Sequence, residues 1–294
     1  MSLIDRVRLR FDHVSIACES IESGVSFFQR YFPIYPRHEK QVSEQASGAF
    51  LWQDFYLGGV AVEVISELPG VKGFITEFIR RHGEGLHHIS FEVDRLDPIV
   101  ALLKREGVRI VDECALEDGS RTAFISPRAA FGTLIQFWQP VDYDNPITPP
   151  VDDGLARFDH LALAVADIGR AMEFFRRYFD AQVVHEPVLS SSQGNFILGH
   201  VDIAGVTIEF LQSPGPETRD DFVSRFINRY GEGLHHLTVQ VRDFDGLLDR
   251  LKRDRVRIVG QEVNWRGERQ FFISPESALG TLVQVWDASV GGGE

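Results

Sequence analysis

Two adjacent histidines begin two similar segments of this chain, and they are the first residues whose types could do chemistry. The segment GEGLHHISFEV, residues 83–93, returns as GEGLHHLTVQV, residues 231–241. Histidine is the commonest metal ligand and titrates close to neutral pH. Because the pair recurs in the same local setting, we infer a duplicated unit that contains a binding site.

Strand alternation separates the members of each histidine pair, because successive side chains point to opposite faces of a strand. It predicts His87 on an apolar face under a helix and His88 on a polar face. It separates His235 from His236 in the same way. We therefore expect His87 and His235 to be structural or to orient their neighbours.

The same rule applies to the strand-like segment FDHVSIA, residues 11–17. It places His13 on one face with Phe11 and the small residue Ser15, and Asp12 on the other face. His160 has the same setting in the second copy. Histidines beside small residues indicate a concave face with room for a ligand.

Polar residues also interrupt two apolar strands at matching places in both halves. Glu63 and Glu209 lie in VAVEVI and VTIEFL, and Gln136 and Gln284 lie in TLIQFW and TLVQVW. A buried carboxylate or amide without a partner costs about 1–3 kcal/mol or more. Because the same polar types recur in both halves, we infer that these side chains have a binding partner in each half.

These positions form two matching sets of candidate metal ligands: His13, Glu63, His88 and Gln136, and His160, Glu209, His236 and Gln284. Two imidazoles, a carboxylate and an amide oxygen suit a divalent ion such as Fe, Co, Ni, Mn or Zn. A single histidine at a strand start is more often a hydrogen-bonded structural residue. The repetition of the whole set favours metal binding.

The repeat covers nearly the whole chain of 294 residues, with matching positions 146 to 148 residues apart. We predict domains at 1–140 and 156–294, joined by a linker rich in Pro and Asp at 141–155. The order of strand and helix patterns predicts an α+β fold of four βαβββ modules. The stretches 36–47 and 185–195 differ between the halves and are interpreted as pocket-lining loops.

Composition and charge exclude several classes of protein. The net charge of −13 argues against a nucleic-acid partner. No apolar run is long enough for a membrane span. The first residues, MSLIDRVRLR, do not resemble a signal peptide. Two cysteines are too few for a disulfide framework. We expect a cytoplasmic protein with a small-molecule substrate, and unpaired module edges leave a homodimer open.

The chain resembles the vicinal oxygen chelate superfamily over residues 9–139 and 156–287, and GLHHISFEVD, RTAFISP and GTLIQFWQ resemble motifs of methylmalonyl-CoA epimerases. The resemblance implies two glyoxalase-like domains, each a cupped mixed β-sheet with helices outside and a metal held by the residues above. It favours an isomerase, epimerase or lyase acting on a small oxoacid, acyl or thioester substrate, with Glu63 or Glu209 as catalytic base.

One departure from the family keeps other functions open. The last-strand ligand of epimerases is usually Glu, whereas Gln136 and Gln284 stand there in this chain, and an amide cannot take a proton near neutral pH. The alternatives are an Fe(II)-dependent dioxygenase, favoured by two histidines and one carboxylate, and a non-catalytic small-molecule binding protein.

Two arginines recur before the FISP segments, Arg121 and Arg269. An arginine fork suits a substrate carboxylate or phosphate, so we consider both as substrate-binding residues. The alternative is a surface ion pair with an acidic neighbour.

Overall fold

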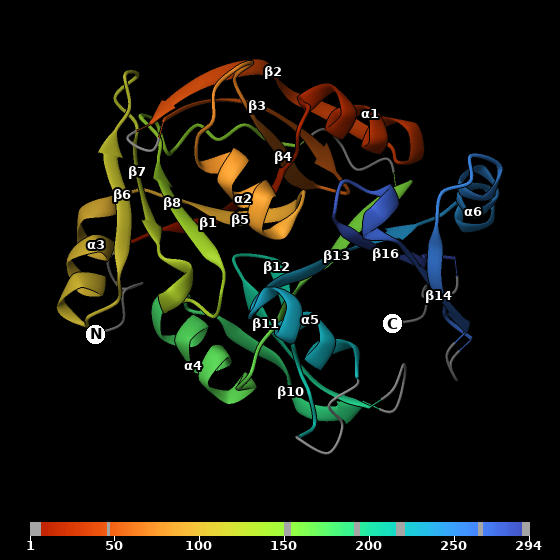
Figure 1. The fold of residues 1–294 in the computed structure, drawn as a ribbon. Helices are drawn as coiled ribbons and strands as arrows, with labels where there is room; N and C mark the ends of the chain where they lie inside the picture. Colours follow the sequence, from red (N-terminus) through yellow and green to blue (C-terminus); the bar gives the residue numbers. More distant parts are fainter. Residues whose placement is uncertain are drawn as a thin grey trace.

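The fold consists of two eight-stranded mixed sheets, one from each half of the chain (Figure 1). The computed structural model describes residues 7–45, 48–149, 154–190, 195–215, 221–263 and 267–289. The elements of the N-terminal half are β1 (Leu9–Ala17), α1 (Ile21–Tyr31), β2 (Ile34–Gln45), β3 (Gly48–Leu57), β4 (Val60–Glu67), α2 (Phe74–His82), β5 (Gly85–Val93), α3 (Leu96–Arg105), β6 (Ile110–Ala115), β7 (Arg121–Ile125) and β8 (Leu134–Gln139). Those of the C-terminal half are β9 (Ala156–Ala164), α4 (Ile168–Phe179), β10 (Gln182–Ser190), β11 (Phe196–Ile203), β12 (Val206–Gln212), α5 (Phe222–Tyr230), β13 (Gly233–Val241), α6 (Phe244–Arg253), β14 (Ile258–Val263), β15 (Arg269–Ile273) and β16 (Leu282–Asp287).

Each sheet joins two βαβββ modules, which confirms the expected α+β class. The strand order is β2-β3-β4-β1-β5-β8-β7-β6 in the first sheet and β10-β11-β12-β9-β13-β16-β15-β14 in the second. The modules meet where β1 pairs with β5 in antiparallel fashion, and β1–β4 and β5–β8 are parallel pairs. The first and last strands of each module therefore lie together at the centre of the sheet.

Helices α1 and α3 cover the convex face of the first sheet through their apolar stripes. In α1, Ser20 accepts a hydrogen bond from the backbone N–H of Ser23 at the N-cap, and Ile21 and Phe28 are buried. The apolar strand residues Val14 and Val64 belong to the same core cluster as these helices. The alternation of residues along each strand thus separates this apolar face from the polar concave face.

Helices α2 and α5 differ, because they lie on the concave side. Phe74 and Phe78 of α2 pack with Phe50 and Ile65 in a separate small cluster. Ile65 follows Glu63 by two residues on β4 and shares its face. The concave face of each sheet and the helix over it form what we call the N-terminal and C-terminal cups.

The stretches 36–47 and 185–195, predicted to be loops, are in their described parts mostly the edge strands β2 and β10. The prediction was wrong because an edge strand pairs on one side only and is exposed on much of its surface. Such a strand needs no apolar alternation, and β10 has an exposed or half-buried residue at every position.

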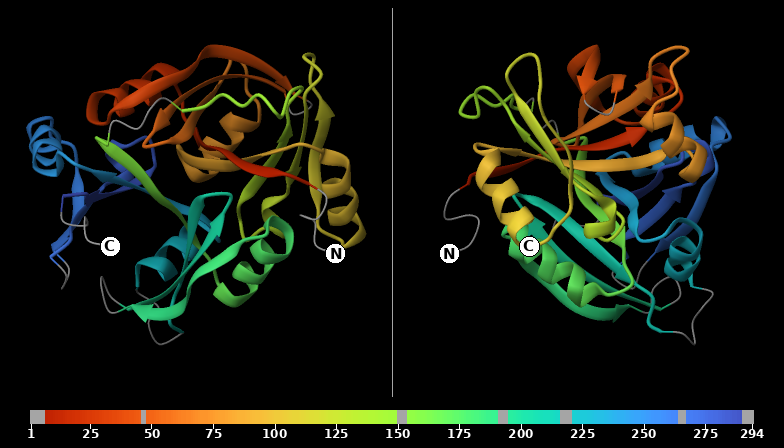
Figure 2. Two further views of the ribbon diagram at one scale, coloured as in Figure 1. Left: turned by 180° about the vertical axis from the view of Figure 1, so that it is seen from behind. Right: turned by 60° about the vertical axis from the view of Figure 1, so that its left-hand side comes forward.

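The convex faces of both sheets share one continuous core. Phe179 of α4 packs against Phe91 and Phe137 of the first sheet, with ring centroids 5.0 Å and 5.4 Å apart. Tyr178 of α4 donates a hydrogen bond to Glu106 after α3, and Tyr31 of α1 donates one to Asp254 after α6. Figure 2 shows α4 beside α3 in both views.

The described parts of the segment between the sheets, residues 140–149 and 154–155, contain no helix or strand. Tyr143 lies under the guanidinium of Arg10, 3.9 Å from its carbon to the ring centroid. We propose the two sheets as the two domains, with the boundaries predicted above. Among the described residues, no helix combines the length and apolar character that a membrane span requires.

Candidate metal centres

The central strands of the first sheet bring Glu63 and His88 together around one small residue. Ser15 on β1 pairs in register with Glu63 on β4 at one side and with His88 on β5 at the other. Because directly paired residues point to the same face of a sheet, both side chains enter the N-terminal cup. Both are buried.

The other two predicted ligands lie one step further along the same strands. Ser90 on β5 pairs with His13 on β1 and with Gln136 on β8. The sheet order β4-β1-β5-β8 therefore collects four side chains that lie far apart in the sequence.

The donor atoms of three of these residues converge. The Nε2 atoms of His13 and His88 lie 3.1 Å apart, and Glu63 Oε2 lies 3.4 Å and 3.7 Å from them. Glu63 Oε2 is buried and has no hydrogen-bond partner among the described residues. Ligand atoms at about 2.0–2.2 Å from one ion lie roughly 3–3.6 Å from each other, so the residues fit a divalent metal.

The C-terminal cup repeats this geometry. The Nε2 atoms of His160 and His236 lie 3.3 Å apart, and Glu209 Oε2 lies 3.5 Å and 3.7 Å from them. Gln284 Oε1 lies 3.1 Å from Nε2 of His236. Thr238 Oγ1, at 2.9 Å from His160 Nε2, takes the place that Ser90 has in the first cup.

The two glutamines are held by their amide nitrogens. Gln136 Nε2 donates to Thr122 Oγ1 at 3.1 Å, and Gln284 Nε2 donates to Gln270 Oε1 at 2.5 Å. An amide anchored through its nitrogen directs its oxygen to the other side. In the C-terminal cup that oxygen faces the histidines.

Aspartates adjacent to the first-strand histidines hold their rings. His13 Nδ1 donates to Asp12 Oδ2 at 2.8 Å, and His160 Nδ1 donates to Asp159 Oδ1 at 2.7 Å. This bond keeps a proton on Nδ1, so that Nε2 is the nitrogen that binds a metal once the second proton of the imidazolium has left, an arrangement typical of metal-ligating histidines. Neither aspartate was a predicted site residue, although the repeated RFDH segment contained the signal.

The predicted placement of Asp12 opposite His13 was wrong because β1 has a bulge there. Phe11 pairs with Phe91 and His13 with Ser90, which leaves Asp12 as the extra residue. Ser90 Oγ donates to Asp12 Oδ2, so Asp12 lies on the concave face. Phe11 packs against Phe91 on the convex side rather than beside His13.

The double histidine also lies at a bulge, so the prediction for His87 was wrong in part. Ser15 pairs with His88 and Ile16 with Leu86, which leaves His87 as the extra residue. Its ring packs against Phe78 of α2 on the concave side, with centroids 4.7 Å apart. The expected contact with a helix is thus made with α2, on the same side as His88. His235 packs against Phe226 of α5 in the same way.

The pKa values of the two candidate histidine ligands in the N-terminal cup, His13 and His88, shift in opposite directions. Burial by itself lowers the pKa of His13, but the charges of Glu63 and Asp12 raise it to about 10. Burial holds the pKa of His88 well below its usual value. Burial raises the pKa of Glu63, but the positive charge of His13 lowers it to about 2. The carboxylate is therefore ionised, as a metal ligand must be.

The two cups differ at the residue opposite the glutamate. Asp54 pairs in register with Glu63 and is bound by Arg37 at 3.2 Å and His38 at 2.8 Å. His200 pairs with Glu209, and its Nε2 lies 3.2 Å from Glu209 Oε1. Sequence reasoning missed these residues, because they lie on strands without a shared motif.

Arg121 and Arg269 do not join the two donor sets. Arg121 donates to Asp97 of α3 at 2.7 Å, and Arg269 donates to Asp245 of α6 at 2.7 Å and to Asp287. Thr122, the strand neighbour of Arg121, is the residue that faces Gln136. These contacts are those of the surface ion pairs considered as the alternative to substrate binding.

An N-terminal cavity of about 320 Å³ adjoins the first donor set. Glu63, His88 and Gln136 line one side of it, and Phe74 and Phe78 of α2 line another. A cavity of this size admits a small acyl or oxoacid group. The donor set, the burial and this space together define a candidate metal centre.

Comparison with known proteins agrees with this geometry. Residues 12–124 and 157–283 each match a model described as the Glyoxalase/Bleomycin resistance protein/Dioxygenase superfamily. The chain belongs to this superfamily, with two of its domains in tandem. The expected resemblance is thereby confirmed.

Two curated relatives match about half of the chain. A Bacillus subtilis protein named YqjC, described as uncharacterised, is 31% identical over 133 residues, which are 45% of this chain and 92% of that protein. Human mitochondrial methylmalonyl-CoA epimerase is 29% identical over 138 residues, 46% of this chain and 75% of the epimerase. The N-terminal half is related to that epimerase.

A solved structure is similar over both halves. A mutant 4-hydroxymandelate synthase from Streptomyces coelicolor covers 95% of this chain and 92% of its own, with a TM-score of 0.64 and 15% identity. At this identity the likeness concerns the fold. It indicates that the tandem arrangement of two sheets occurs elsewhere in a single chain.

Proposed function

We propose that this protein is a metal-dependent enzyme of the isomerase, epimerase or lyase kind, with one divalent ion in each cup. Glu63 Oε2 carries the proposal, because it is a buried, ionised oxygen without a hydrogen-bond partner among the described residues, and it faces two imidazole nitrogens. Leaving such a group uncompensated is costly. In the metal-free protein the raised pKa of His13 puts the compensating charge on that imidazole, 3.4 Å away, and a divalent cation between the three donors would supply it instead.

The proposed ligands are His13, Glu63, His88 and Gln136, and His160, Glu209, His236 and Gln284. A divalent ion in this position supplies Lewis acidity toward two neighbouring oxygens of a substrate and stabilises the negative charge that develops when a C–H proton leaves. Asp12 and Asp159 hold the histidine rings in the required tautomer. Phe74 and Phe78 of α2 give the N-terminal cavity an apolar wall.

The proton would be taken by Glu63 or Glu209. Each is the carboxylate of its donor set, and the last-strand positions are amides that cannot accept a proton. In the C-terminal cup, His200 holds Glu209 Oε1 while Oε2 faces the other two histidines. In that cup Oε2 would bind the ion, and Oε1, on the side of His200, would accept the proton.

The substrate class follows from the cavity and from the relatives. The space beside Glu63 suits a small oxoacid, acyl or thioester group, and the human relative is named for methylmalonyl-CoA. We therefore propose an acyl compound with an acidic C–H next to a carbonyl. Arg121 and Arg269 are not part of this proposal, because their ion pairs with Asp97 and Asp245 account for them.

Elemental analysis of the untagged protein tests the metal sites. After incubation with Co, Ni or Zn, or with Fe(II) without oxygen, we expect about two ions per chain, and about one in each of Glu63→Ala and Glu209→Ala. Glu173→Ala, which removes an exposed carboxylate, should retain both ions. A wild-type chain without metal would overturn the proposal and favour a binding protein.

Deuterium exchange distinguishes an isomerase, epimerase or lyase from a dioxygenase. Wild-type protein in D₂O should exchange the acidic C–H of methylmalonyl-CoA, measured by NMR, and each Glu→Ala variant should lower the rate. The donor set also suits Fe(II), so a dioxygenase remains the second candidate. Oxygen uptake by iron-loaded protein with a catechol or 2-oxoacid, without deuterium exchange, would establish it.

A further inference from the structure

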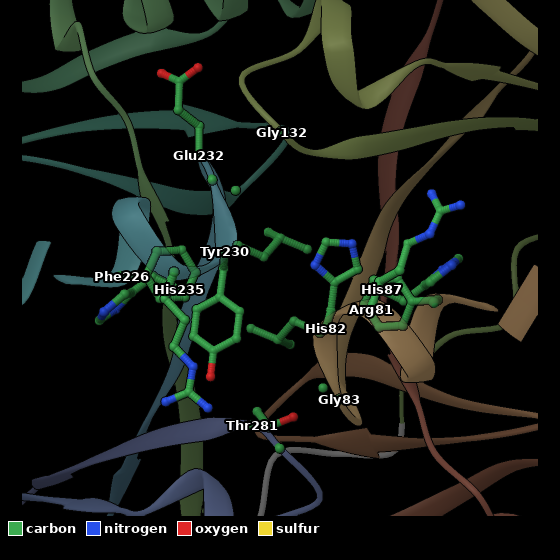
Figure 3. A pocket seen from close by; sticks show the side chains of 18 of the residues that line it. Arg81, His82, Gly83, His87, Gly132, Phe226, Tyr230, Glu232, His235 and Thr281 are labelled. Atoms are coloured by element: carbon green, nitrogen blue, oxygen red, sulfur yellow. The ribbon is translucent and has the colours of Figure 1, made fainter. Parts of the chain in front are cut away.

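A second and larger cavity lies between the two halves of the molecule, with a volume of about 1330 Å³. Its walls come from the C-terminal ends of α2 and α5 and from the first residues of β5 and β13. Figure 3 shows His82 and Tyr230 on opposite sides of this cleft, with Phe226 beside Tyr230. The cleft has four times the volume of the cavity beside Glu63, more than a small acyl group needs.

At the floor of the cleft the two halves approach each other by their backbones. A Cβ atom on Gly132 would lie 1.6 Å from the carbonyl oxygen of Glu232, and one on Gly280 would lie 1.6 Å from that of Glu84. Side chains are excluded at both contacts. The two halves therefore meet backbone to backbone beside this space.

Arginines line the cleft, and two of them have no carboxylate partner. Arg128 and Arg229 make no ion pair with any residue in the described part of the chain. Arg229 lies over the ring of Tyr230, 5.0 Å from its centroid. Arg81, the counterpart of Arg229 on α2, shares Glu77 with Arg80.

The carboxylates at the cleft are bound to other groups. Glu84 accepts a hydrogen bond from the backbone N–H of Glu19, and Glu232 accepts one from that of Ala166. Glu276 pairs with Arg257 at 2.5 Å. The carboxylate of Glu232 points away from the space between His82 and Tyr230 (Figure 3). Arg128 and Arg229 are thus left without a carboxylate partner in the described part of a chain whose net charge is −13.

The cleft adjoins the N-terminal cup. Phe78, Arg81, His82 and His87 line both this cleft and the cavity that contains Glu63 and His88. The arginines and aromatic rings of the cleft are therefore next to the space where an acyl group at Glu63 would lie.

We propose that the cleft binds the phosphate-bearing, nucleotide-like tail of a substrate whose acyl end enters the N-terminal cup, an inference that rests on the proposed function. The arginines match phosphate oxygens through their planar forks. Tyr230 is 38% exposed, and its ring and that of Phe226 beside it line the cleft, where a planar base would stack against them. Neither feature is required by the chemistry at Glu63.

Calorimetric titration with ADP tests the cleft without using the acyl end. The protein is first stripped of metal with a chelator, so that affinity of ADP for divalent ions does not contribute. We expect wild type to bind ADP, and Arg81→Gln and Arg229→Gln each to weaken binding roughly tenfold. Arg80→Gln is the matched control, because Arg80 also pairs with Glu77 but does not line the cleft.

Two further titrations separate the possible outcomes. Glu63→Ala should bind ADP as wild type does, which distinguishes a failed metal site from a failed cleft. Adenosine should bind at least about tenfold more weakly than ADP, because it lacks the phosphates. The proposal is overturned if wild type binds no ADP, if adenosine binds equally well, or if Arg80→Gln weakens binding as much as Arg81→Gln.

Discussion

The Nδ1 atoms of His87 and His88 lie 2.9 Å apart, although the two residues are neighbours on one strand. The bulge at His87 allows this, because it turns both rings to the concave side. If His88 Nε2 binds a metal, its Nδ1 carries the hydrogen and donates it to His87. The second copy has the same contact between His235 and His236, at 2.8 Å. Each double histidine thus combines a ligand with its orienting partner.

Replacement of His87 by Leu should lower metal affinity in the N-terminal cup by about 10–100-fold, as loss of an orienting partner does elsewhere. Leu keeps the packing against Phe78 and removes the acceptor. Competition with a chromophoric chelator would measure the affinity, and His88→Leu should abolish that site. Wild-type affinity in His87→Leu would mean that His87 only packs against α2.

Asp12→Asn should cost more stability than Asp159→Asn. Asp12 binds the buried Arg37 at 2.8 Å as well as His13, whereas Asp159 is bound by His160 and Gln240. Removing the Asp12 charge leaves Arg37 with Asp54 alone, a loss of about 3 kcal/mol in the free energy of unfolding. The loss of one hydrogen bond predicts about 1 kcal/mol for Asp159→Asn. Urea unfolding of metal-free protein measures both, and equal losses would show that Arg37 does not depend on Asp12.

Phe179→Ala should destabilise both halves together. Phe179 is nearly fully buried, and its ring contacts Phe91 and Phe137 of the other half. Truncation of such a ring costs about 3–5 kcal/mol. Calorimetry should show one transition at a lower temperature. A loss confined to one of two separate transitions would contradict the shared core.

Gly132→Ala should destabilise the chain more than Gly107→Ala. Both glycines have positive φ, +74° and +76°, so both substitutions carry the backbone strain of that region, about 1 kcal/mol. Only at Gly132 would the new Cβ collide with backbone of the other half, while nothing lies within 4 Å at Gly107. Thermal unfolding should show the difference, and equal shifts would mean that the halves separate easily at this contact.

Much of the candidate site was predictable from the sequence because it depends on local pattern. The duplicated segments, the polar residues inside apolar strands and the alternation rule identified His88, Glu63 and their counterparts. These side chains do converge in both cups. Alternation is a property of the backbone within one strand, so no long-range information was needed.

The tertiary structure decided what depends on contacts between strands. A bulge is defined by the pairing of two strands, so neither the place of Asp12 beside His13 nor that of His87 beside His88 followed from one strand. The difference between Asp54 and His200 opposite the glutamates required the register of β3 and β11. The cleft between the halves arises from packing of Phe179 and the close approach at Gly132, which join residues far apart in the sequence. The sequence by itself determined which side chains could bind a metal, and the long-range packing decided how they are oriented and what space surrounds them.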